Sequence, residues 1–130
     1  MTRIAGYAAL FDIPDGAKDT IRPGAFARTL AERRDALPLY WQHRPDQRIG
    51  YVEAIAEDTR GLRVVARLDN PQSRAVSALL AKAVNGLSFG YRARGFRRTP
   101  AGRVLEDIEL FEVSLVTHPL QHGARVHFIA

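Results

Sequence analysis

The sequence predicts a mainly β fold with flanking helices, of the α+β class. About seven strands are expected to form a closed barrel with two or more helices on its surface. Short runs of alternating apolar and polar residues recur between turns rich in glycine, proline and aspartate, a pattern typical of strands joined by hairpins. Closure of the sheet would remove its exposed edges. The chain has no repeat and no linker, so residues 1–130 are expected to form a single domain.

The first predicted elements are a strand, a loop and a helix. Residues 6–11 form a short apolar run, which predicts a buried strand. Residues 12–19 are rich in turn-forming residues and predict a loop. Pro23 and Gly24 then begin a helix that ends before Pro38 and lies on the surface.

Residues 37–43 predict the second strand. Leu39, Trp41 and His43 share one face of it, because side chains alternate along a strand. We expect the strand to end at residues 44–46, since the proline there cannot donate a hydrogen bond to a ladder.

A hairpin and a second helix follow. Residues 49–56 and 62–68 predict two strands, with a turn at residues 58–61. The next helix is expected to have Asn70 as its N-cap, followed by a proline at the first helical position, and to end at Gly86 as a C-terminal cap. Its apolar stripe consists of Ala75, Val76, Leu79, Leu80 and Ala83.

Three strands complete the predicted fold. They occupy residues 87–96, 104–116 and 124–129. Turns at residues 100–102 and 119–123 separate them, because proline and glycine cluster at both places.

The composition limits the kinds of function. The absence of cysteine excludes disulfides, thiolate nucleophiles and cysteine-ligated zinc. No apolar run approaches 18 residues and the first residues lack the apolar segment of a secretory signal, so we expect neither a membrane span nor secretion. His118 and His122 are four residues apart, but Pro119 and Gly123 disrupt the helix that a metal site of this spacing needs. We therefore expect no metal, and we expect no cofactor.

The chain carries a net charge of +5, and 17 of its 19 basic residues are arginine. Guanidinium groups form forked hydrogen bonds with carboxylates and phosphates, so acidic proteins and nucleic acid are both open as partners. Arginines interleaved with Tyr91 and Phe96 in one predicted hairpin favour a basic β-barrel that binds nucleic acid, although a solvated hairpin surface is the simpler interpretation. These arginines are Arg92, Arg94, Arg97, Arg98 and Arg103.

Ser88 is the candidate nucleophile. It lies between Gly86 and Gly90 in the pattern G-x-S-x-G, where a predicted helix ends and a strand begins. The nucleophile elbow of α/β-hydrolases has the opposite order, with the strand first, so that fold is not indicated. The alternative is that Ser88 is only a small residue tolerated at the junction.

A serine nucleophile needs a base, and the base is usually oriented by a third group. The candidates for the base are four histidines, and each taken alone could be only a surface or half-buried residue: His43, His118, His122 and His127. His43 is placed at the end of a strand, where its imidazole is reachable at a barrel rim. Glu112 lies in an otherwise apolar strand, where a carboxylate is costly unless it is paired. On that strand Glu112 shares a face with Ser114, and Phe111 shares the opposite face with Val113 and Leu115. A solvent-facing glutamate is the alternative.

Three sequence blocks together resemble the prohead (capsid maturation) serine proteases of tailed phages, prophages and gene transfer agents. They are residues 39–43 followed by Ile49 and Gly50, residues 87–91, and residues 111–116. Residues 6–11 and 22–26 fit the same family, so the resemblance extends from about Ile4 to about Phe128.

The resemblance implies a fold similar to herpesvirus assemblin, a β-barrel wrapped by helices. It places the nucleophile at Ser88 and the base at His43. Glu112 stands about where assemblins carry a second histidine, so it is our choice for the third member, with His118 as the alternative. Arginine and backbone N–H groups form the assemblin oxyanion hole, and Arg125 is our candidate for that arginine.

The implied function is cleavage of scaffold, or of the N-terminal scaffolding segment of the major capsid protein, during prohead maturation. The implied partners are therefore the major capsid and scaffolding proteins, with a homodimer also allowed and no nucleic acid or membrane expected. The implied location is inside the assembling procapsid in the bacterial host cytoplasm. A catalytically inactive capsid-assembly protein that retains the barrel is the remaining alternative.

Overall fold

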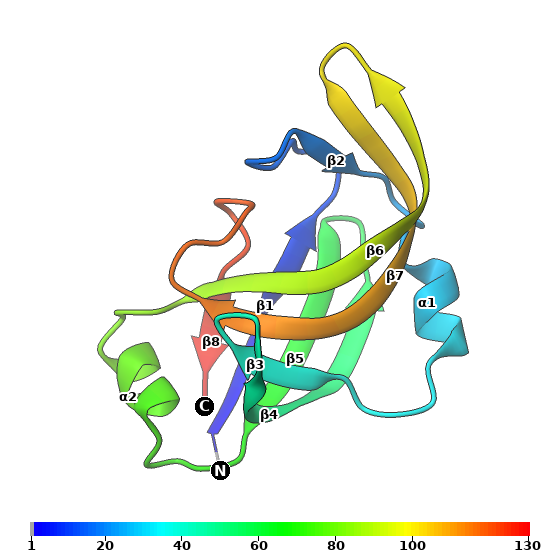
Figure 1. The fold of residues 1–130 in the computed structure, drawn as a ribbon. Helices are drawn as coiled ribbons and strands as arrows, with labels where there is room; N and C mark the ends of the chain where they lie inside the picture. Colours follow the sequence, from blue (N-terminus) through cyan, green and yellow to red (C-terminus); the bar gives the residue numbers. More distant parts are fainter. Residues whose placement is uncertain (1) are drawn as a thin grey trace.

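The computed structural model describes residues 2–130 and shows a mainly β protein with two short helices (Figure 1). The strands are β1 (Thr2–Leu10), β2 (Asp19–Ile21), β3 (Pro38–Trp41), β4 (Arg44–Glu57), β5 (Gly61–Leu68), β6 (Gly86–Thr99), β7 (Gly102–Val116) and β8 (Val126–Ile129). The helices are α1 (Ala27–Glu32) and α2 (Arg74–Leu80). The predicted mainly β fold with flanking helices is confirmed.

The eight strands form one strongly curled sheet, a half-barrel in shape (Figure 1). Its order is β2-β7-β3-β4-β5-β1-β8, and β6 pairs with β7. One isolated bridge, between Gly86 and Arg125, connects the start of β6 with the segment before β8. Complete closure of the sheet into a barrel stays a prediction. The apolar core lies inside the curl, and its largest fully buried side chains include Phe26, Ile4, Leu39, Leu62, Leu68 and Leu115.

A β-bulge interrupts the long β6–β7 hairpin at Phe111. Gly90 pairs with Glu112 and Tyr91 with Leu110, so Phe111 has no partner on β6. The expectation that Phe111 faces the same way as Val113 was wrong, because the extra residue shifts the alternation of the strand. Phe111 is 52% exposed, whereas Val113 is fully buried.

Helix α1 is shorter than predicted and begins at Ala27 rather than at Pro23. Gly24, at a φ of 92°, lies in the turn before it. The carboxylate of Glu57, on β4, accepts the backbone N–H groups of Gly24 at 2.7 Å and Phe26 at 2.8 Å. Acidic oxygens stabilise the N–H groups that are left unpaired at the start of a helix, so β4 fixes the position of α1.

Helix α2 begins and ends at other residues than the sequence predicted. Ser73 is its N-cap, and its hydroxyl accepts the N–H of Val76 at 3.3 Å. Asn70 instead caps the preceding turn, where its side chain accepts the N–H of Gln72. The residue that reverses the chain after α2 is Lys82, at a φ of 58°, so Gly86 is not the C-terminal cap.

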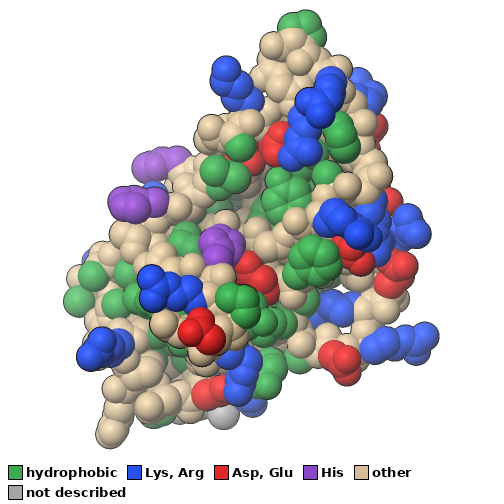
Figure 2. Space-filling view, in the orientation of Figure 1, with side chains coloured by type: hydrophobic (Ala, Val, Ile, Leu, Met, Phe, Trp, Pro, Cys, Tyr) green, Lys and Arg blue, Asp and Glu red, His purple; other side chains and the backbone are tan. Residues whose placement is uncertain are grey.

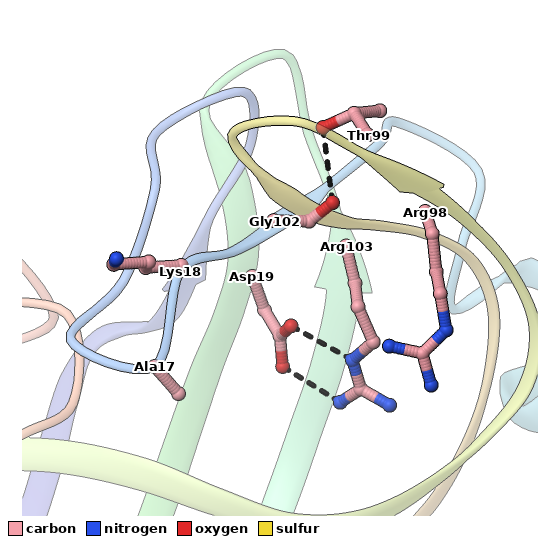
Figure 3. Close-up of a pocket in the computed structure, with 7 residues that line it drawn as sticks. All are labelled: Ala17, Lys18, Asp19, Arg98, Thr99, Gly102 and Arg103. Carbon is pink, nitrogen blue, oxygen red and sulfur yellow. Dashed lines mark hydrogen bonds and ion pairs between the residues drawn. The ribbon is translucent and has the colours of Figure 1, made fainter.

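Strand β2 lies partly in a segment that we predicted to be a loop. Its three residues pair in parallel with residues 103–105 of β7, a partnership that spans more than eighty residues of sequence and leaves no local signal. Asp19, on β2, is 3% exposed and forms two hydrogen bonds with the guanidinium of Arg103, at 2.9 and 2.8 Å (Figure 3). The hydroxyl of Tyr91 donates a third bond to Asp19 at 3.1 Å. These bonds fasten the end of the β6–β7 hairpin to the N-terminal part of the chain.

The substitution Asp19→Asn should destabilise the protein by about 2–3 kcal/mol at pH 7, because it leaves Arg103 without its carboxylate. The hydrogen bonds with Arg103 lower the pKa of Asp19. A carboxyl whose pKa is lower in the folded state stabilises it above the unfolded pKa of about 3.9, and the benefit is lost as the pH falls through the folded pKa. Denaturant unfolding should therefore show a deficit at pH 7 that shrinks below about pH 4.

The matched control is Asp12→Asn, which removes the exposed ion pair with Arg22. Asparagine tolerates the positive φ of 62° at this position, so the backbone should not change. The expected cost is below about 1 kcal/mol. Equal losses in the two variants would show that the buried Asp19 is no more important than a surface carboxylate.

Candidate active site

A tight two-residue turn carries the candidate base. Gln42 and His43 connect β3 to β4, and both have a positive φ, 53° and 60°. Strand β4 begins at Arg44, so our expectation that residues 44–46 end the strand and that the next begins at Ile49 was wrong. The ladder with β3 shifts between its Arg44 and Arg48 pairs, and the intervening residues 45–47 have no partner on β3. Pro45 is one of these unpaired residues, so its missing N–H costs no hydrogen bond to β3.

Gln42 fastens this turn to the end of β7. Its backbone N–H donates to the carbonyl of Leu115 at 2.9 Å. Its side-chain amide donates to Thr117 Oγ1 at 2.7 Å and accepts the backbone N–H of Thr117 at 3.2 Å. A non-glycine residue in the left-handed region costs about 1–3 kcal/mol and persists only where its surroundings impose it. These three hydrogen bonds are part of what imposes it here.

His43 and Glu112 are joined directly. The Nδ1 atom of His43 lies 2.6 Å from Glu112 Oε1, and Ser114 Oγ donates to Glu112 Oε2 at 2.6 Å. Ser114 Oγ also accepts the backbone N–H of His43 at 3.2 Å. The Glu112 side chain is 10% exposed and that of His43 is 43% exposed. A buried carboxylate thus holds one nitrogen of a histidine whose ring remains open to solvent.

This contact raises the pKa of His43. The hydrogen bond with Glu112 is the largest cause, desolvation opposes it, and the negative charge of Glu112 adds to it. Because Nδ1 faces the carboxylate, Nε2 is the nitrogen that can accept a proton from another group. Within residues 2–130, Nε2 of His43 has no hydrogen-bond partner. The arrangement is that of an oriented histidine whose other ring nitrogen is unoccupied, which is the geometry that a candidate base needs.

Gly90 makes room for this carboxylate. A Cβ atom at residue 90 would lie 2.5 Å from Oε1 of Glu112, which is the oxygen that contacts His43. Gly90 is also paired directly with Glu112 across the β6–β7 ladder. The second glycine of the G-x-S-x-G pattern therefore serves Glu112, and its resemblance to a nucleophile elbow is incidental.

Ser88 lies on the strand beside this pair. It is paired with Ser114 in the β6–β7 ladder, and directly paired residues project from the same face of a sheet. The side chain of Ser88 is half-buried and borders a small cavity of about 20 Å³ between Phe89, Leu120 and Gln121. Among the described residues, no hydrogen bond connects Ser88 with His43. The structure therefore joins His43 to Glu112 and places Ser88 one strand away on the same face, with no hydrogen bond to His43.

The other candidates lie outside this hydrogen-bonded group. His118 is exposed in the segment after β7. The third member of a triad would bind Nδ1 of His43, and the carboxylate of Glu112 already occupies that nitrogen. Arg125 pairs through its backbone with Gly86, two residues before Ser88. Its guanidinium donates to Asn85 Oδ1 and to the carbonyl of His122, each at 2.8 Å.

Three residues of the site, Ser114, Gln42 and Thr117, were not chosen as site residues from the sequence. Ser114 carried a signal, because the strand alternation already placed it on the face of Glu112. The hydrogen bonds between Gln42 and Thr117 left no signal in the sequence. They join two residues that are 75 positions apart, and they form only because the turn lies against the end of a strand.

Most of the arginines in the β6–β7 hairpin are neutralised by carboxylates. Figure 2 shows acidic and basic side chains intermingled around this hairpin and α1. The charge available for a nucleic acid backbone is therefore smaller than the sequence suggests, which favours the solvated hairpin surface. The ion pairs are Arg92–Glu109, Arg94–Glu32, Arg94–Glu109, Arg97–Glu106 and Arg103–Asp19.

A cavity of about 380 Å³ lies at the end of the hairpin, between Lys18, Arg98 and Arg103 (Figure 3). It is lined by none of the three proposed catalytic residues. Over residues 2–130 we find no cluster of three or more histidine, aspartate or glutamate side chains suited to a metal ion. No helix in that part of the chain has the length and apolar character needed to cross a bilayer.

Comparison with solved structures confirms the type of fold. The chain resembles the protease of Kaposi's sarcoma-associated herpesvirus in complex with a hexapeptide phosphonate inhibitor, with a TM-score of 0.71, 15% identity, and coverage of 99% of this chain and 64% of that one. It also resembles the capsid assembly protease of bacteriophage T4, with a TM-score of 0.69, 14% identity, and coverage of 88% and 80%. At these identities the likeness concerns the fold alone.

Comparison of sequences identifies the family. The chain is 30% identical over 128 residues to the prohead protease of Enterobacteria phage HK97, covering 93% of this chain and 57% of that protein. It therefore spans little more than half the length of this relative. This relative is a phage protein and gives no support to an origin in a gene transfer agent. The family described as Caudovirus prohead serine protease matches residues 1–130, and the chain belongs to that family.

Proposed function

We propose that this chain is a serine endopeptidase in which Ser88 is the nucleophile, His43 the base and Glu112 the group that orients the base. The observation that carries the proposal is the 2.6 Å contact between His43 Nδ1 and a buried carboxylate on the strand that pairs with the strand of Ser88. Family membership and the register of Ser88 opposite Ser114 support it.

In the reaction, Nε2 of His43 takes the hydroxyl proton of Ser88 as Oγ attacks the carbonyl carbon of a peptide bond. The negative charge moves to the carbonyl oxygen, and Glu112 stabilises the imidazolium. His43 then gives its proton to the leaving amine as the C–N bond breaks, which leaves an ester on Ser88. A water molecule, activated by the same histidine, hydrolyses the ester and restores the enzyme.

Arg125 remains our candidate for stabilising the carbonyl oxygen. Arg125 is paired with Gly86, and Gly86 and Ser88 lie on the same face of β6, so the side chain of Arg125 leaves the backbone on the face of Ser88. Its guanidinium is held by Asn85 and His122 in the free protein, so it would have to exchange at least one of these partners for the oxyanion.

The substrates that we propose are scaffold or the N-terminal scaffolding segment of the major capsid protein. Support comes from membership of the prohead protease family and from the net charge of +5, which suits acidic substrates. The proposal also includes action inside the assembling procapsid of the bacterial host, a homodimer as an allowed assembly, and closure of the curled sheet into a barrel.

The substitution Ser88→Ala should abolish trimming of the cognate capsid protein when the two are expressed together, because alanine has no nucleophilic oxygen. The measurement is the mass of the capsid protein on a gel and by mass spectrometry. Ser77→Ala, at an exposed serine on α2, is the matched control and should trim normally. Continued trimming by Ser88→Ala would end the proposal.

The pH dependence should report the pair of His43 and Glu112. His43 must be neutral to accept a proton, and its pKa is raised, so the reactivity of Ser88 should rise with pH through an inflection above the ordinary histidine value of about 6.5. Glu112→Gln should lower the plateau by about 10³–10⁴-fold and move the inflection down toward that value. The rate of Ser88 labelling by a fluorophosphonate, measured from pH 5 to pH 9, tests both.

His118→Ala is the comparison for this experiment, and it should keep the wild-type rate and inflection. Full activity in Glu112→Gln together with loss in His118→Ala would transfer the orienting role to His118.

Gly90→Ala should displace the Glu112 carboxylate, because the added methyl would lie 2.5 Å from Oε1. We expect the pKa of His43, measured by NMR titration, to fall toward its ordinary value and Ser88 labelling to slow by about a hundred-fold. Gly95→Ala is the matched control on the same strand, since its Cβ would lie 3.4 Å from Asp107 and meet no other side chain. An unchanged His43 pKa in Gly90→Ala would contradict the role assigned to this glycine.

A further inference from the structure

Ser114 lies at the centre of the hydrogen bonds that hold the candidate base and its carboxylate. Its hydroxyl donates to Glu112 Oε2 at 2.6 Å and accepts the backbone N–H of His43 at 3.2 Å. The residue is fully buried. One hydroxyl thus connects the turn of His43 with the strand of Glu112, and water does not compete for it.

The bond with Glu112 fixes the rotation of the carboxylate. Oε1 of Glu112 contacts His43, so Oε2 is the oxygen left for Ser114. A carboxylate oxygen that is buried without a donor is costly, and the group would rotate or withdraw to find one. Ser114 therefore keeps Oε1 directed at His43 by satisfying the other oxygen.

The bond with the His43 backbone fixes the turn. His43 has a φ of 60°, a conformation that a non-glycine residue adopts at a cost. Its N–H group points to Ser114 Oγ in that conformation. Because φ determines where the side chain leaves the backbone, the same bond sets the direction of the imidazole.

Ser114 is also one of three consecutive β7 residues at which the three strands of the site meet. In the sheet it is paired with Tyr40 of β3 on one side and with Ser88 of β6 on the other. The backbone of Ser114 thus links the strand that leads to His43 with the strand that carries Ser88.

We propose that Ser114 is a positioning residue for the His43–Glu112 pair, an inference that rests on the proposed peptidase function. It holds Oε1 of Glu112 on Nδ1 of His43 and holds the His43 turn in its left-handed conformation. It takes no part in bond making with the substrate.

The test is Ser114→Ala, followed by NMR titration of His43 and by the rate of Ser88 labelling with a fluorophosphonate. Without the hydroxyl, Glu112 loses the donor on Oε2 and the turn loses its anchor. The pKa of His43 should fall toward its ordinary value, and labelling should slow by about ten- to a hundred-fold. Ser114→Cys keeps a similar volume with a weak S–H donor, and should show smaller changes in the same direction. If Ser114→Ala does not fold, the same two measurements on Ser114→Cys test the proposal.

Thr29→Val is the matched control. Thr29, on α1, is buried, and its hydroxyl accepts the N–H of Leu110 on β7 at 3.0 Å. Its loss removes a comparable buried hydrogen bond to the same strand, so it should lower thermal stability and leave the His43 pKa and the labelling rate unchanged.

The outcomes separate this inference from the proposed function. If wild-type Ser88 is not labelled, the peptidase proposal fails, and the His43 titration still decides whether Ser114 positions the pair. If Ser114→Ala and Ser114→Cys keep the wild-type His43 pKa and labelling rate, or if Thr29→Val changes both to the same extent, Ser114 has only a structural role.

Discussion

The buried carboxylate of Glu112 is the constraint on which the candidate site depends. Its two oxygens have separate partners, His43 on one side and Ser114 on the other. Gly90 leaves the space in which the group lies. A carboxylate removed from water must be fully hydrogen-bonded, so each of these neighbours is needed where it is. The left-handed turn at His43 and the glycine at residue 90 both serve that requirement.

The sheet brings these groups together because β7 is shared by two partners. Its C-terminal half pairs in parallel with β3, which leads into the turn of His43, and antiparallel with β6, which carries Ser88. The carboxylate thus lies on the central strand, with the base on one side and the candidate nucleophile on the other. The far end of the same strand is anchored separately, through Arg103 and Asp19. The site and the hairpin tip are therefore fixed by different interactions along one strand.

The local backbone of the site is irregular. Gln42 and His43 both occupy the left-handed region, and Phe111 is an unpaired bulge residue beside Glu112. Such irregular positions are favoured where a fold must aim a side chain, and they persist only when surrounding contacts impose them. Here the contacts of Gln42 with Thr117 are part of that support.

The sequence alone determined the class of fold and most of the strands, since apolar alternation is a local signal. A lone carboxylate in an apolar strand marked Glu112 as a group that needs a partner, and the resemblance to the prohead proteases pointed to His43. The sequence misplaced the start of α1 and missed β2, because the contacts of Glu57 with the turn before α1 and the pairing of β2 with β7 are long-range. It also misplaced the start of α2, where two local capping residues, Asn70 and Ser73, compete and Ser73 caps the helix. The tertiary structure decided the left-handed turn at His43 and the space at Gly90. Those features depend on atoms from strands distant in sequence, and no local pattern encodes where such strands will meet.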